Sequence, residues 1–326
     1  MKQRTASTGR SEFPDGTCSS PGPSTSMPLP SAGFLSTAGH LSREDLKLPH
    51  LQRSSSELLP DPTNITTTTS QHTKMASNPP AKCCTIGVKH DGTPKGESIT
   101  VAGKYAGYLA TPPIEKRHEG VGLLYIPDVI GIWQNSKLMA DQLAANGYLT
   151  LIIDVFNGDP VPLNRDDSFD FMAWLTKGST GDNPHTKEAV DPIVVDAIRT
   201  LKESYGVKKL GALGYCFGAK YVARHYKSGI DVGYFAHPSF VEEDELASIT
   251  GPLSIAAAET DAIFPAEKRH KSEEILQKTG HPYQINLYSG VEHGFSVRGD
   301  ISNKVIKYAK EQAFLQAVFW FDEYLL

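Results

Sequence analysis

Five residues at positions 214–218, Gly-Tyr-Cys-Phe-Gly, constrain the fold more than any other feature of this sequence. A short apolar stretch at 210–213 leads into them, and a stretch with helical character at 219–225 follows. This pattern predicts a strand, a tight turn and a helix, with Cys216 at the apex. The flanking glycines let the strand and the helix approach closely, and the apex residue is expected to have a strained backbone. The free N–H groups and the dipole at the start of the helix favour a thiolate and can bind an oxyanion.

Two further reactive side chains follow strand-like segments later in the chain. The apolar run at 252–258 ends just before Asp261, and the alternating segment at 282–288 leads into a loop at 289–295 that carries His293. A nucleophile, an acid and a histidine in this order are typical of the α/β-hydrolase elbow G-x-S-x-G, here with cysteine in place of serine. The sequence therefore predicts a catalytic triad of Cys216, Asp261 and His293.

Each member of this predicted triad has an alternative interpretation. A lone cysteine at a strand end is often a small buried apolar residue. His293 could be a solvated loop histidine, and Glu259 competes with Asp261 as the acid. His237 also follows a strand but precedes the acid, which breaks the usual order, so it is a candidate for lining the pocket.

Composition divides the chain near residue 80. Residues 1–78 contain 14 Ser, 11 Thr and 8 Pro, and their large apolar residues are sparse. Such a segment cannot bury enough surface to offset the entropy of ordering it, so 1–78 is predicted to be a disordered extension. Residues 79–326 are long enough for one α/β domain with a substantial core.

Within this domain, strand-like and helix-like segments alternate. Strands are predicted within 98–111 on either side of Gly103, and at 121–126, 148–155, 210–213, 231–236, 252–258 and 282–288. Helices are predicted at 135–146, 186–205 and 303–326, with an irregular stretch at 156–185. Near-continuously apolar strands that alternate with helices indicate a mainly parallel sheet covered on both faces. Ligands bind at the carboxyl ends of such strands, where all three predicted triad residues fall.

Charge and cysteine usage exclude several classes of function. Residues 1–78 carry 7 basic and 6 acidic residues, which leaves 25 basic and 31 acidic residues for the domain. This balance argues against binding to nucleic acid or to a membrane surface. No apolar run is long enough to span a membrane, and the N-terminus lacks a secretory signal. The four cysteines do not resemble a disulfide framework, so a cytoplasmic location is expected, with a mitochondrial one as the weaker alternative. Cys83 and Cys84 are predicted to be structural, and no metal or cofactor is expected.

Residues 81–326 resemble the dienelactone hydrolase family, particularly its fungal members. The resemblance is carried by the segments 127–131, 154–160, 214–218, 259–261 and 292–295. It implies an α/β-hydrolase fold, with a mainly parallel central sheet and helices on both faces. It also implies a triad of Cys216, His293 and Asp261, with the backbone N–H groups of Val129 and Phe217 as oxyanion donors.

The resemblance suggests roles for further residues. Bacterial members of the family place a glutamate beside the nucleophile that helps to deprotonate it, and this chain has Asp128 there, which could also be a helix N-cap. Bacterial members also hold a substrate carboxylate with arginines. Arg165 and Arg298 are the candidates here, although either could form a surface ion pair, and Arg298 falls one residue later than the bacterial pattern. Trp133 could contribute to an aromatic-lined pocket.

These observations predict a cofactor-free cysteine hydrolase that acts on a small ester, lactone or thioester through an acyl-thioester intermediate. The alternative is a hydrolase-fold protein with altered catalysis, used for ligand binding or as an isomerase or cyclase in a biosynthetic pathway. The expected partner is a small-molecule ester or lactone, and the expected state is a monomer or a homodimer.

Overall fold

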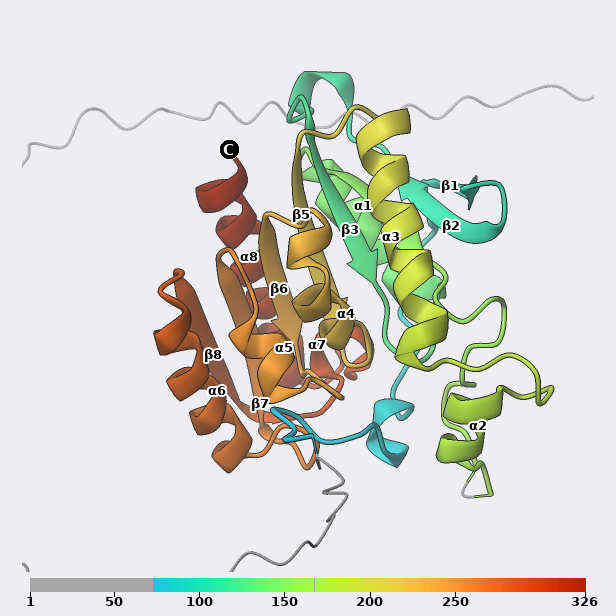
Figure 1. The fold of residues 1–326 in the computed structure, drawn as a ribbon, viewed down its shortest axis with the longest axis vertical. Coiled ribbons are helices and arrows are strands. Elements are labelled where there is room, and N and C mark those ends of the chain that lie inside the picture. The colour runs from blue at the N-terminus through green and yellow to red at the C-terminus, as the bar shows by residue number, and fades with distance from the viewer. Residues whose placement is uncertain (1–72, 167) are drawn as a thin grey trace, which may run out of the picture. The chain divides into compact units, whose positions relative to one another are not determined.

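The computed structural model describes residues 73–166 and 168–326 (Figure 1). Residues 1–72 of the predicted extension, 1–78, therefore lie outside the described residues. Its last residues pack against the domain: Met75 forms an isolated antiparallel bridge with Glu242, and Ser77 is fully buried. The contacts of the domain thus begin before position 79.

The described residues form one eight-stranded sheet with the strand order β1-β2-β4-β3-β5-β6-β7-β8 (Figure 1). The first two strands are antiparallel to their neighbours, and all other pairs are parallel. The mainly parallel sheet that the sequence predicts is confirmed. The strands are β1 (Glu97–Val101), β2 (Tyr105–Ala110), β3 (Val121–Ile126), β4 (Leu149–Ile153), β5 (Lys209–Tyr215), β6 (Val232–Ala236), β7 (Leu253–Thr260) and β8 (Tyr283–Glu292).

One predicted boundary is wrong. The sequence suggested a loop from 289 onward, whereas β8 continues to Glu292. An irregularity in the β7 pairing between Ala258 and Thr260 brings Thr260 opposite Glu292 and extends the ladder. The predicted histidine therefore follows directly on the end of a strand.

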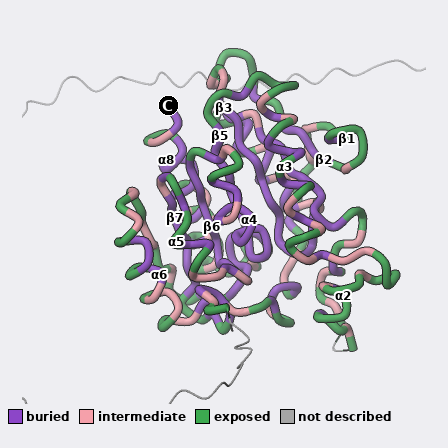
Figure 2. The backbone as a smooth tube through the Cα atoms, in the orientation of Figure 1, coloured by how far each residue is buried: buried purple, intermediate pink, exposed green. Residues whose placement is uncertain are grey.

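Helices cover both faces of the sheet. The apolar side chains of β3 and of other strands alternate between two buried clusters, as expected for a strand with a two-residue period. One cluster includes α3, α4, α5 and α6, and the other includes α1, α7 and α8. Figure 2 shows the buried strands in the middle, with exposed residues on the outer helices. The helices are α1 (Gln134–Ala145), α2 (Phe171–Lys177), α3 (Lys187–Ser204), α4 (Gly218–Arg224), α5 (Glu243–Ala247), α6 (Ala266–Thr279), α7 (Phe295–Arg298) and α8 (Lys304–Leu325), with short 3-10 turns η1 (Lys82–Cys84), η2 (Ile114–Lys116) and η3 (Tyr226–Ser228).

In the part of the chain that the structure describes, no helix has the length and apolar character needed to cross a membrane. The cytoplasmic location and the monomeric or homodimeric state stay predictions.

Residues 75–88, here called the N-terminal strap, cross the carboxyl ends of the strands. The strap is held by backbone hydrogen bonds to the segments that follow β4, β6, β7 and β8. These bonds join Thr85 to Asn164 (2.8 Å), Ser77 to Val241 (3.0 Å), Asn78 to Ile263 (2.7 Å) and Val88 to Arg298 (2.9 Å). The strap therefore covers the edge of the sheet at which the sequence places the reactive residues.

Candidate active site

The turn between β5 and α4 has the geometry that the glycine pattern predicts. Cys216 has a positive φ of 51°, a conformation that costs energy for a residue with a side chain. A Cβ atom at Gly218 would collide with the carbonyl oxygen of Ile126, and one at Gly214 would lie 2.6 Å from the backbone nitrogen of Ala219. Both glycines are therefore required by the close approach of backbone segments, and the turn presents Cys216 at its apex.

The Cys216 thiol is completely buried, with 0% of the residue exposed. Its Sγ lies 3.4 Å from the hydroxyl oxygen of Ser239. Burial by itself would raise the pKa of Cys216, but a hydrogen bond from Cys84 and the positive charge of His293 lower this pKa well below its usual value. These surroundings therefore favour the thiolate form of Cys216.

His293 and Asp261 lie together next to this thiolate. The Nδ1 atom of His293 is 2.9 Å from Oδ2 and 3.1 Å from Oδ1 of Asp261. The carboxylate is held in turn by the backbone N–H groups of Ile263 (2.8 Å) and Phe264 (3.0 Å). Burial lowers the pKa of His293, but the charges of Asp261 and Cys216 outweigh it and raise this pKa to about 10. The structure thus brings the three predicted residues together, with their reactive atoms in one buried cluster.

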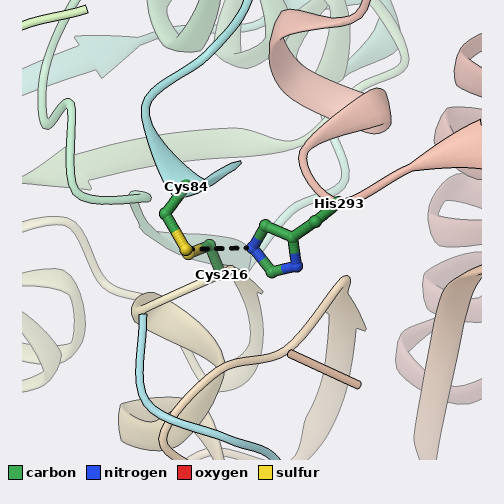
Figure 3. A group of neighbouring side chains, drawn as sticks. All are labelled: Cys84, Cys216 and His293. Carbon is green, nitrogen blue, oxygen red and sulfur yellow. Dashed lines mark hydrogen bonds between the residues drawn. The ribbon is translucent and has the colours of Figure 1, made fainter. Parts of the chain in front are cut away.

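A fourth reactive side chain, Cys84, belongs to this cluster. Its Sγ lies 3.4 Å from Nε2 of His293, and it is fully buried. Figure 3 shows Cys84, Cys216 and His293 converging, with Cys84 supplied by the strap. The ligand atoms of these three residues all lie within 4.8 Å of one another, so they are the described residues that could hold a metal ion. Burial raises the pKa of Cys84 well above its usual value, which keeps it a neutral thiol that donates to Cys216.

Sequence reasoning missed Cys84, which it treated as structural together with Cys83. Its side chain reaches the site only because the strap runs back across the sheet. The separation of 132 residues between Cys84 and Cys216 gives no local signal for this path. The adjacent Cys83 is only partly buried, and its interaction with the side chain of Cys84 lowers the pKa of Cys83 to about 7.

Asp128 forms a buried ion pair with Arg298 in the same region. The Asp128 carboxylate also accepts a hydrogen bond from the N–H of Ile130 at 3.1 Å. Burial raises the pKa of Asp128 to about 6, although the charge of Arg298 opposes this rise. The resemblance suggested that a carboxylate at this position helps to deprotonate Cys216. Among the described residues, however, the hydrogen-bond partners of Asp128 do not include Cys216.

Arg298 is 1% exposed, so the alternative of a surface ion pair is wrong for this residue. Besides Asp128, its guanidinium donates to the carbonyl oxygens of Cys83 (3.2 Å) and Ile86 (3.1 Å). These contacts fasten the strap to the domain on either side of Cys84. Arg298, predicted as a contact for substrate, is thus surrounded by protein groups.

The remaining predicted residues are His237, Trp133 and Arg165, and the contacts described for them are with protein groups other than the thiols. His237 is buried behind His293, with ring centroids 4.9 Å apart and its Nε2 2.7 Å from the hydroxyl of Ser296. Burial, together with the charges of His293 and Arg298, lowers the pKa of His237 well below its usual value, so it stays neutral. Trp133 is the half-buried N-cap residue of α1. Arg165 packs on the ring of Phe169, 5.0 Å from its centroid, and donates to the carbonyl of that residue at 3.1 Å.

The two predicted oxyanion donors lie at the expected places. Phe217 immediately precedes α4, and Val129 follows β3 beside Asp128. Across residues 73–166 and 168–326, neither backbone N–H donates a hydrogen bond to another protein group. Both groups are therefore free to bind an acceptor from a ligand.

The fold and the elbow place the chain among the hydrolases of the α/β-hydrolase fold. More narrowly, the chain belongs to the dienelactone hydrolase family, because the family model matches residues 105–325. The hydrolase tropI of Talaromyces stipitatus is 50% identical over 255 residues, which cover 77% of this chain and 99% of the relative. Dienlactone hydrolase 1 of Gibberella moniliformis is 35% identical over 262 residues, 77% of this chain and 96% of the relative.

A solved structure of a candidate dienelactone hydrolase from Klebsiella pneumoniae shares the fold, with a TM-score of 0.55 and 15% identity. The alignment covers 71% of this chain and 98% of that one. The predicted family and fold class are confirmed. The protein is a hydrolase that acts on ester or lactone bonds.

Proposed function

We propose that Cys216, His293 and Asp261 form the catalytic triad and that the enzyme hydrolyses a small, uncharged ester or lactone. The Cys216 thiolate attacks the carbonyl carbon, and the N–H groups of Val129 and Phe217 stabilise the oxyanion. The carbon–oxygen bond then breaks, and His293 transfers its proton from Nε2 to the departing oxygen. This step leaves an acyl-thioester on Cys216.

Water completes the reaction. Neutral His293 removes a proton from a water molecule, which attacks the thioester carbonyl. The carbon–sulfur bond breaks, the carboxylic acid is released, and the thiolate–imidazolium pair is restored. Asp261 holds the His293 ring in the orientation that both proton transfers need.

The observation that carries this proposal is the paired contact of His293. Its Nδ1 atom lies 2.9 Å from the Asp261 carboxylate, whereas its Nε2 atom lies 3.4 Å from Sγ of Cys84 and within 4.8 Å of Sγ of Cys216. The pKa of the neighbouring Cys216 thiol is lowered well below its usual value. Strongly shifted pKa values of this kind cluster at functional sites, which supports a catalytic role for the pair.

The contacts of Arg298 support a neutral substrate. Its guanidinium is shared between the Asp128 carboxylate and two backbone carbonyls of the strap. A substrate carboxylate would have to displace a buried partner, and breaking a buried ion pair costs several kcal/mol. Arg298 is therefore assigned here to positioning Asp128 and the strap.

The test compares the full chain with its Cys216→Ala variant on aryl acetates and neutral enol lactones. Cys83→Ala is the matched control, because it removes a neighbouring thiol that is not part of the triad. We expect turnover by the parent and by the control, no turnover by Cys216→Ala, and an acyl adduct on Cys216 by mass spectrometry after rapid quenching. Equal rates for parent and Cys216→Ala would refute the triad and favour the alternative of altered catalysis.

A further inference from the structure

We propose that Cys84, Cys216 and His293 also form a binding site for Zn²⁺ and that the bound ion inhibits the hydrolase. The proposed inhibition by Zn²⁺ rests on the catalytic triad proposed above, whereas the proposed binding of Zn²⁺ does not depend on that triad. The site is distinct in composition from the triad, because it replaces Asp261 by a second thiol as a direct ligand.

The distances fit a tetrahedral zinc centre. Zinc–sulfur bonds of ~2.3 Å and zinc–nitrogen bonds of ~2.0 Å place two sulfurs roughly 3.8 Å apart and a sulfur and a nitrogen about 3.5 Å apart. Cys84 Sγ and His293 Nε2 are already 3.4 Å apart, and all three ligand atoms lie within 4.8 Å of one another. Shifts of a few tenths of an ångström up to about one ångström would complete the geometry.

The chemistry of the donors selects the same class of ion. Two sulfurs and one imidazole nitrogen are soft to intermediate ligands, which favour Zn²⁺ over Mg²⁺ or Ca²⁺. Three protein ligands leave the fourth position for water. When Zn²⁺ binds, a Zn–S bond replaces the S–H bond of Cys84 and a Zn–N bond replaces the Nε2–H bond of His293. Both protons pass to solvent.

The surroundings of His293 are those of a metal ligand. Ligating histidines usually donate their second N–H to a carboxylate, which fixes the ring and directs the other nitrogen at the metal. Asp261 accepts from Nδ1 of His293 at 2.9 Å, so Nε2 is the atom that faces the thiols. His237 packs against the same ring and restricts its rotation.

Occupation of this site would stop the hydrolase, since Cys216 and His293 would no longer be free to attack and to transfer protons. The distinguishing residue is Cys84, which lowers the pKa of Cys216 but neither attacks the substrate nor transfers a proton in the proposed reaction. Removing its thiol should weaken zinc binding without removing either the nucleophile or the base.

The experiment measures zinc binding directly. The full chain is stripped of metals, kept under argon with a phosphine reductant so that no disulfide forms, and titrated with Zn²⁺ against a chromophoric chelator. We expect one tight site per chain. Affinity should fall at least about 100-fold in Cys84→Ala, because removal of even a partner beyond the ligands costs about 10–100-fold. Cys83→Ala should bind like the parent.

A second measurement needs no variant. Co²⁺ bound to the parent should give an intense thiolate charge-transfer band with tetrahedral visible absorption. An octahedral spectrum without that band would refute the site even if Cys84→Ala failed to fold. Equal zinc affinity in the parent and Cys84→Ala would also refute it.

The activity assay then tests inhibition. Zn²⁺ should inhibit the parent at the concentration that fills the site, and a chelator should restore the rate. Each variant is compared with its own rate without zinc. Inhibition that persists unchanged in Cys84→Ala would refute the proposed role of Cys84. A parent without turnover would refute the triad, and the binding measurements would still decide the metal site.

Discussion

Replacement of Arg298 by methionine should destabilise the protein in a pH-dependent way. The substitution preserves much of the apolar stem but leaves the Asp128 carboxylate buried without its counter-charge. In the parent, the pKa of Asp128 is already raised to about 6 by burial, even with Arg298 beside it. Without the guanidinium we expect a value of about 8, which is in the range known for buried carboxyl groups.

The size of the effect follows from these values. A carboxyl group with a raised pKa stabilises the folded protein at low pH, and this contribution is lost as the pH rises through the folded-state pKa. Raising the pKa of Asp128 from about 6 to about 8 therefore costs about 2 kcal/mol more at pH 8 than at pH 5. With the lost hydrogen bonds to the strap, the total loss at pH 8 should be about 3–5 kcal/mol.

Urea unfolding followed by tryptophan fluorescence at pH 5 and pH 8 measures the total loss of unfolding free energy at pH 8 and its difference from the loss at pH 5. The matched control removes Arg298 in a background without the titrating group, by comparing Arg298→Met/Asp128→Asn with Asp128→Asn. In that pair the loss of free energy should be the same at the two pH values. A loss in Arg298→Met that does not change with pH, or a pH dependence that survives in the control pair, would refute the role of Asp128.

Three further outcomes are expected. Gly218→Ala should lower the unfolding free energy by about 1–3 kcal/mol, because its new methyl group overlaps the backbone at the end of β3. An unchanged Tm would contradict this. Asp261→Asn should reduce kcat by about 10²–10⁴-fold with little change in Tm, and a loss below about tenfold would argue against the triad. Iodoacetamide should alkylate Cys216 at a nearly constant rate from pH 6 to 9, since its pKa is lowered well below the usual value and His293 stays protonated up to about pH 10. A tenfold rise in that rate per pH unit would show an ordinary thiol.

The core of the fold could be predicted because each signal was local. The strand at 121–126 is recovered without error, since its six residues are all buried and apolar or glycine, apart from a tyrosine that is also buried. The helices at 135–146 and 186–205 differ from α1 and α3 by one residue at their ends. The end of β8 was misplaced because the irregular pairing at Ala258 depends on β7, which the segment itself does not reveal.

Among the residues of the site, those with local sequence signals could be predicted and those without could not. Cys216, Asp261 and His293 follow strands and keep a known order, so their convergence could be predicted. The partnership of Arg298 with Asp128 and the approach of Cys84 depend on how α7 and the strap meet across the sheet. No spacing rule in the sequence predicts these contacts between α7 and the strap.

The strap has an evolutionary consequence. The family model begins at residue 105, and Cys84 lies 21 residues before that point, so the region that the family model matches, here called the shared domain, does not include every side chain around the nucleophile. A chain trimmed to the shared domain would retain the nucleophile, the base and the acid but open them to bulk water. Substitutions in the strap can therefore change which acyl groups reach Cys216 while the residues that carry out the chemistry stay the same.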